Sequence, residues 1–101
     1  MSVAADAAGG ADALTRTLTI VNQRGLHARA AAKFVRLAGT FDAAVIVSNE
    51  DNEVSALSIM GLMMLAASKG NDIVLRASGR QAQEALDGLA ELVGSKFGEK
   101  E

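Results

Sequence analysis

The chain has 101 residues, enough for one domain, and half of them are apolar, so a core of ordinary size can form. A formal net charge of −2 gives no long-range attraction for nucleic acid or anionic lipid, so neither is an expected partner. The lack of cysteine excludes disulfides, thiol catalysis and cysteine-ligated metal, and a single histidine excludes a histidine-rich metal site.

No apolar run is long enough to span a membrane, and the N-terminus lacks the basic start and long apolar stretch of a secretory signal. We therefore expect a cytoplasmic monomer with no membrane insertion, no metal and no cofactor. Residues 1–13 are rich in Ala, Gly and Asp and have no apolar period, and adjacent Gly9 and Gly10 argue against a helix. They are expected to form a flexible tail before a domain spanning residues 14–101.

The first half of that domain predicts two strands around a helix. Residues 14–20 alternate between threonines and mostly apolar side chains, which indicates a half-buried strand. Its apolar face comprises Leu14, Leu18 and Ile20. Residues 28–37 carry apolar side chains at helical spacing, with Gly39 as the stop, and residues 43–48 alternate again.

The second half continues with a polar turn at residues 49–52, a short strand at 53–55 and a short helix at 58–65. A strand at residues 72–77 and a helix from residue 82 to about 94–96 follow, and the last, polar residues are expected to fray. The order β-α-β-β-α-β-α predicts an α+β fold of two layers. One four-stranded antiparallel sheet carries three helices on one face and exposes the other to water.

The stretch Gly25-Leu26-His27-Ala28-Arg29-Ala30 joins the first strand to the first helix and holds the only histidine. A helix N-terminus favours anions, a neutral imidazole can carry a group covalently, and the Arg29 guanidinium suits phosphate oxygens. Gly25 would let the backbone approach a ligand closely. These features suggest a phosphoryl group on His27. From the chemistry alone, a capping or solvated histidine beside a surface arginine is the commoner reading.

The short helix at residues 58–65 is the second informative stretch. Ser58 can cap it, and on a helical wheel Leu62 and Leu65 share one face. The other face is an apolar patch that consists of Ile59, Met60 and Met63. If the leucines enter the core, the patch stays exposed and can dock a partner. The alternative is a helix buried on all sides.

Both stretches, with their spacing and the element order, resemble the histidine-containing phosphocarrier proteins (HPr and NPr) of the phosphoenolpyruvate-dependent phosphotransferase system over residues 14–97. The resemblance implies an open-faced β-sandwich. It also implies a carrier that is a covalent intermediate and not an independent enzyme, taking phosphate from enzyme I on Nδ1 of His27 and passing it to a IIA-type protein. Arg29 would stabilise the phosphate.

The resemblance further implies partner contacts through Arg24, Ala28 and the patch of Ile59, Met60 and Met63. Ser58 matches a serine that HPr kinase/phosphorylase modifies in some lineages. Two positions depart from the family: Ala30 replaces a common proline, and Leu57 replaces the lysine or asparagine often found before the serine.

Residues 39–43, 68–70 and 96–99 look similar to the nitrogen branch of the system and favour it weakly over sugar transport. The alternative function is a small regulatory module that docks through Ile59, Met60 and Met63 without phosphotransfer. A hydrolytic enzyme is disfavoured, because no general base or metal group accompanies His27 in its motif.

Overall fold

A single sheet and one layer of helices make up the residues that the computed structural model describes, 13–50 and 52–100. The sheet is antiparallel, with strand order β1-β4-β2-β3. The strands are β1 (Leu14–Thr19), β2 (Ala44–Asn49), β3 (Asn52–Ser55) and β4 (Asp72–Ser78). The helices are α2 (Ala28–Ala38), α3 (Ile59–Met64), α4 (Ala82–Gly94) and the 3₁₀ turn η1 (Lys96–Gly98).

The sheet buries one face because its two central strands alternate in step. Val45 and Val47 of β2 are buried, and so are Ile73, Leu75 and Ala77 of β4. The register sets Val47 opposite Leu75 and Val45 opposite Ala77. Facing residues of paired strands point to the same side, so these side chains form one continuous apolar surface.

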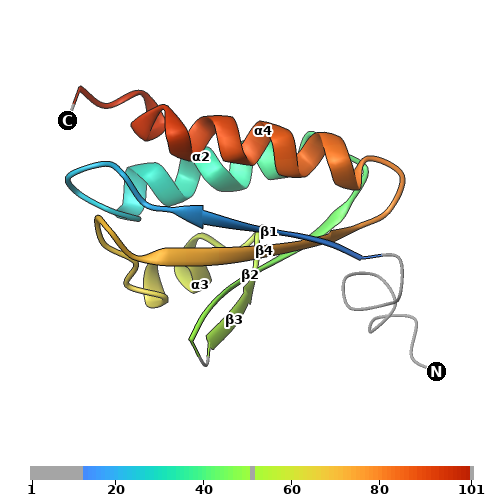
Figure 1. Cartoon of the computed structure of the whole chain (residues 1–101), viewed down its shortest axis with the longest axis horizontal. Helices are drawn as coiled ribbons and strands as arrows, with labels where there is room; N and C mark the ends of the chain where they lie inside the picture. The colour runs from blue at the N-terminus through green and yellow to red at the C-terminus, as the bar shows by residue number, and fades with distance from the viewer. Residues whose placement is uncertain (1–12, 51, 101) are drawn as a thin grey trace.

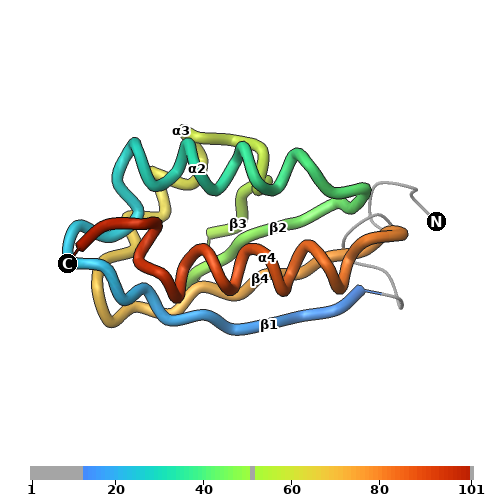
Figure 2. Tube along the Cα trace, turned by 90° about the horizontal axis from the view of Figure 1, so that it is seen from above, coloured from blue at the N-terminus to red at the C-terminus, as the bar shows by residue number. Residues whose placement is uncertain are grey.

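Two helices cover that surface. Figure 1 shows α2 and α4 running along the same face of the sheet, and Figure 2 shows them side by side. The buried residues of α2 are Ala30, Ala31, Phe34 and Ala38, and those of α4 are Ala82, Ala85, Leu86, Leu89 and Val93. Many of them are alanines, which let the helices lie close to the strands. Helix α3 packs against α2 and β3 and completes the layer.

The predicted order of elements, the antiparallel sheet and the open face are confirmed. Leu14 differs from its prediction: it is 39% exposed because it begins an edge strand at the rim of the core. The expectation of a frayed C-terminus is wrong for residues 96–100, since η1 follows α4 and buries Phe97. Of the predicted tail, residues 1–12 lie outside the described residues, and Ala13 belongs to no helix or strand.

Candidate functional site

The turn before α2 is fixed against the segment that leads into β4. Gly25 has φ +68, and a Cβ at this position would lie 2.6 Å from the carbonyl oxygen of Ala67. Leu26 donates its backbone N–H to that same oxygen at 2.9 Å. The positive φ and the contact with Ala67 are therefore sufficient to require glycine at this position.

His27 is the N-cap residue of α2. Its backbone is extended, its carbonyl accepts from Ala31 N–H at 2.8 Å, and its side chain makes no capping bond. No acidic residue occupies the first turn. The first N–H groups of a helix have no partner within the helix and carry its positive dipole end. The start of α2 thus keeps a potential that favours an anion.

The imidazole of His27 faces a carboxylate from the far end of the chain. Nε2 lies 2.5 Å from Oε2 of Glu99, and the two side chains are only 16% and 18% exposed. The other carboxylate oxygen accepts from Nδ2 of Asn22, a residue that is completely buried. The alternative reading of His27 as a solvated surface residue therefore does not hold. Figures 1 and 2 both place the C-terminal segment beside the loop that precedes α2.

Glu99 is held as an anion by its neighbours. The hydrogen bond from His27 is the largest cause that lowers its pKa below the usual value, and the bond from Asn22 and the charge of Arg24 act in the same direction. Burial, the second-largest cause, acts to raise the pKa of Glu99 but does not outweigh the causes that lower it. At neutral pH the group beside His27 is a carboxylate, which can accept hydrogen bonds but cannot donate one.

The segment that carries Glu99 is anchored in the core. Phe97 is fully buried, and its carbonyl accepts from Nζ of Lys33 on α2 at 2.7 Å. Lys96 and Phe97 have φ values of 61 and 56, a left-handed conformation that is costly for residues other than glycine and persists where packing enforces it. Sequence reasoning missed Asn22, Phe97 and Glu99 as parts of this site.

The side chain predicted to bind the phosphate, that of Arg29, has fewer contacts than the imidazole of His27. Arg29 lies exposed in the first turn of α2 and makes no hydrogen bond or ion pair with the described residues. Arg24 and Ala28, predicted as partner contacts, are exposed beside His27 in the chain, and the charge of Arg24 acts on Glu99. The structure therefore leaves these side chains accessible from solvent.

Helix α3 has the predicted division between buried and exposed faces. Ser58 is its N-cap, with Oγ accepting from Gly61 N–H at 2.9 Å. Leu62 and Leu65 enter the core. The predicted docking residues, here called the α3 patch, are exposed: Ile59 at 40%, Met60 at 72% and Met63 at 44%. Leu57 and Met64, which the wheel did not assign to the patch, are exposed as well and enlarge the apolar surface.

The two predicted motifs come together in space. Helix α3 lies alongside α2, and in both views it sits near the half of α2 that begins at His27. Leu62 of α3 belongs to the same core cluster as the buried residues of α2. A partner that covers the α3 patch would therefore approach the histidine end of α2.

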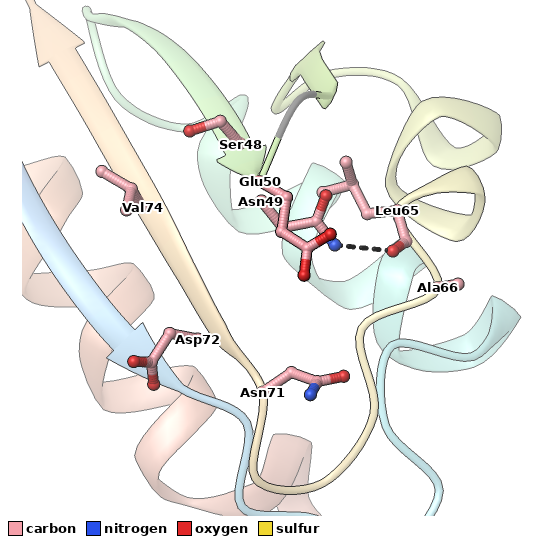
Figure 3. A pocket seen from close by; sticks show the side chains of 8 residues that line it. All are labelled: Ser48, Asn49, Glu50, Leu65, Ala66, Asn71, Asp72 and Val74. Carbon is pink, nitrogen blue, oxygen red and sulfur yellow. Dashed lines mark hydrogen bonds between the residues drawn. The ribbon is translucent and has the colours of Figure 1, made fainter.

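A hollow of about 510 Å³ lies elsewhere, where β2 ends and β4 begins. Figure 3 shows its lining, in which Asn49 donates to the carbonyl of Leu65 at 2.7 Å and Glu50 and Asp72 contribute carboxylates. None of the predicted site residues lines it. Among residues 13–50 and 52–100, no three His, Asp or Glu side chains gather as a metal site. No helix in this part of the chain is long and apolar enough to cross a membrane.

The comparisons with known proteins agree with the geometry. A family model described as "PTS HPr component phosphorylation site" matches residues 14–95, which defines a phosphocarrier of the phosphotransferase system. The chain belongs to the HPr/NPr family. Family membership implies partners in that system such as enzyme I and IIA proteins.

The similar proteins include carriers of both names. The chain is 49% identical to phosphocarrier protein HPr of Cupriavidus necator, covering 87% of this chain and 99% of the relative. It is 44% identical to phosphocarrier protein NPr of Shewanella violacea, covering 85% and 94%. The crystal structure of HPr-C-His from Thermoanaerobacter tengcongensis superimposes with a TM-score of 0.83 at 43% identity, covering 87% of this chain and 99% of that one.

Proposed function

We propose that His27 is the residue that carries the phosphoryl group, accepting it on Nδ1 from enzyme I and donating it to a IIA-type protein. The observation that carries this proposal is the position of His27. It caps α2 without using its side chain for the cap, and Glu99 engages only Nε2. Nδ1 is thus the ring nitrogen left for a phosphoryl group, beside a helix end that favours anions.

Arg29 is proposed to stabilise the phosphate. It is exposed and stands in the first turn of α2, two residues after His27. A guanidinium offers several donors in a plane, and charge-assisted bonds to phosphate oxygens are about twice as strong as neutral ones. Its lack of a hydrogen-bonding or ionic partner among the described residues leaves those donors available to an incoming phosphoryl group.

The α3 patch is the proposed docking surface for both partners. Exposed Met side chains adapt to different surfaces because they are unbranched and flexible. A carrier must release each partner after transfer, and an adaptable apolar patch next to the reactive histidine suits that cycle. Arg24 and Ala28 would lie at the edge of the same contact.

Met60→Glu tests the docking surface. Because Met60 is 72% exposed, the substitution is expected to leave the thermal midpoint almost unchanged. A buried charge in the contact should weaken binding to enzyme I at least tenfold, equal to about 1.4 kcal/mol. Titration calorimetry measures this. Leu14→Glu, an apolar-to-acid change at the far end of β1, is the matched control and should bind normally. Equal binding by both variants would exclude the patch.

Ser58 is proposed as a regulatory phosphorylation site. Phosphate there adds about −1.5 to −2 charges at neutral pH beside the apolar α3 patch, where a partner must exclude water. The modification would oppose docking without altering His27. Whether HPr kinase/phosphorylase acts on a serine preceded by Leu57 is decided by incubating the protein with such a kinase.

Ser58→Asp imitates that charge. Aspartate caps a helix as well as serine does, so the fold should be retained. Phosphotransfer from enzyme I should slow severalfold through weaker encounter. Ser58→Asn keeps the cap and adds no charge, so it should transfer at the wild-type rate. Stopped-flow phosphorylation rates compare the three proteins, and equal rates for all of them would contradict the regulatory mechanism.

The branch of the phosphotransferase system is a separate proposal. The similarity of residues 39–43, 68–70 and 96–99 of this chain to nitrogen-branch carriers favours that branch, whereas relatives named HPr and NPr match over nearly equal shares of the chain. Capture of IIA-type proteins by the phosphorylated carrier decides the question. A nitrogen-type IIA protein is the expected partner, and exclusive capture of a sugar-type IIA protein would contradict it.

The alternative function is a regulatory module that docks through the α3 patch without phosphotransfer. Incubation with phosphoenolpyruvate and enzyme I separates the two. Only a carrier acquires phosphate that is labile in acid and stable in base. A protein that binds enzyme I and stays unphosphorylated would establish the alternative.

A further inference from the structure

The hydrogen bonds of Asn22 fix the orientation of its side-chain amide beside His27 and Glu99. The carbonyl of Gly25 can only accept, and Nδ2 of Asn22 lies 2.9 Å from it. The same nitrogen donates to Oε1 of Glu99 at 3.1 Å. These two acceptors fix the orientation of the amide, even though the buried Oδ1 of Asn22 is left without a partner among the described residues. Asn22 is thus committed as a donor to Glu99.

The carboxylate of Glu99 in turn determines which ring nitrogen of His27 carries the hydrogen. As an anion Glu99 has acceptors on both oxygens and no donor. Its Oε2 lies 2.5 Å from Nε2 of His27, and because a carboxylate anion can only accept a hydrogen bond, Nε2 must carry the hydrogen. A neutral imidazole has one protonated nitrogen, and its other nitrogen keeps a lone pair. In neutral His27 that nitrogen is Nδ1.

We propose that Glu99 is a positioning residue for phosphotransfer: held by Asn22, it keeps the hydrogen of neutral His27 on Nε2, so that Nδ1 is ready to attack phosphorus. This inference rests on the proposed function of His27. It assigns a role to the C-terminal segment, which reaches the histidine because Phe97 and the Lys33 contact hold it in place.

The carboxylate also serves the transfer step itself. The Nδ1 lone pair forms the N–P bond while the bond between phosphorus and the donor breaks, and its electron pair leaves with the donor. The hydrogen stays on Nε2, and the ring gains one positive charge. Glu99 already accepts from Nε2, so the charge forms next to an anion that needs no movement. On transfer to the acceptor the N–P bond breaks, its electron pair returns to Nδ1, and the ring becomes neutral again.

Glu99→Gln tests the proposal with almost no change of shape. The single carbonyl of glutamine cannot satisfy both Asn22 and His27. With its oxygen toward Asn22, its NH₂ faces Nε2 and requires that nitrogen to accept, which moves the hydrogen to Nδ1. The spectroscopic readout is the ¹⁵N shifts of the single histidine, recorded with the imidazole in its neutral form. We expect Nε2–H in the wild type and a gain of Nδ1–H in the variant.

The kinetic readout is phosphorylation by enzyme I and phosphoenolpyruvate. We expect Glu99→Gln to be slowed roughly tenfold, the effect of losing one charge-assisted bond. Glu91→Gln, the same change on the exposed face of α4, should match the wild type in both measurements. Glu99→Ala, with neither acceptor nor donor, should also be slow, and circular dichroism verifies the fold of each variant.

Different results would contradict the proposed function of His27 and the proposed role of Glu99. If the wild type takes up no phosphate, the proposed function is wrong, whatever the ring nitrogens show. If the wild type is phosphorylated while Glu99→Gln keeps the hydrogen on Nε2 and reacts at the same rate, His27 remains the carrier and the role of Glu99 is overturned.

Discussion

His27→Ala is expected to abolish phosphorylation of the protein by enzyme I and phosphoenolpyruvate. The chain has one histidine, so no second imidazole can take its place. The substitution removes the nucleophile and also the hydrogen bond to Glu99, a bond to a charged group worth at most about 3 kcal/mol. The imidazole forms no capping bond and is not part of the hydrophobic core, so the fold should persist.

Labelled phosphoenolpyruvate and intact-protein mass spectrometry measure this result. His27→Gln is the matched variant, because its amide can still donate to Glu99 but has no nucleophilic ring nitrogen. Both variants should remain unlabelled while their circular dichroism spectra match the wild type. Acid-labile labelling that persists in either folded variant would show that another residue carries the phosphate.

Phe97→Ala is expected to lower the free energy of unfolding by about 3–5 kcal/mol, the usual cost of emptying a buried phenylalanine site. Removing the Phe97 ring should also change the site around His27. Without the ring, the core packing that favours the left-handed backbone at Lys96 and Phe97 is lost, and the segment that carries Glu99 should detach from His27. Phosphorylation of the folded variant should therefore slow as it does for Glu99→Gln.

Urea denaturation and the phosphorylation rate measure the two effects. Phe97→Leu retains most of the buried volume and should cost less than about 1.5 kcal/mol. It should also keep the wild-type rate. If Phe97→Ala destabilises the protein while the rate is unchanged, the C-terminal segment contributes to the core alone and not to the site.

The spacing of apolar residues along the sequence predicted most of the fold. Alternation in residues 14–20 and 72–77 and the helical spacing in residues 82–93 depend on local burial, which a sequence pattern reports directly. The exposed position of Leu14 was not predictable in this way, because alternation does not show where an edge strand leaves the core. The ordered turn after α4 was missed for a similar reason, since Lys96 and Phe97 adopt a conformation that local preferences disfavour.

The site was predictable only in its local part. His27, Ser58 and the α3 patch follow from short stretches in which helix ends and helix faces can be read. Glu99 meets His27 across 72 positions of the chain, and Asn22 meets Glu99 across 77, so no periodicity joins them. One signal was available: Phe97 is one of three aromatic residues, and an aromatic beyond the last helix of a small domain is seldom left in solvent.

The most direct test of the account is the site of phosphate attachment on the imidazole. Phosphorylated protein with ¹⁵N-labelled histidine should show one-bond coupling between ³¹P and Nδ1 of His27, while Nε2 keeps its hydrogen. The single histidine makes the assignment unambiguous. Coupling to Nε2, or bound phosphate with no coupling to either ring nitrogen, would contradict the account.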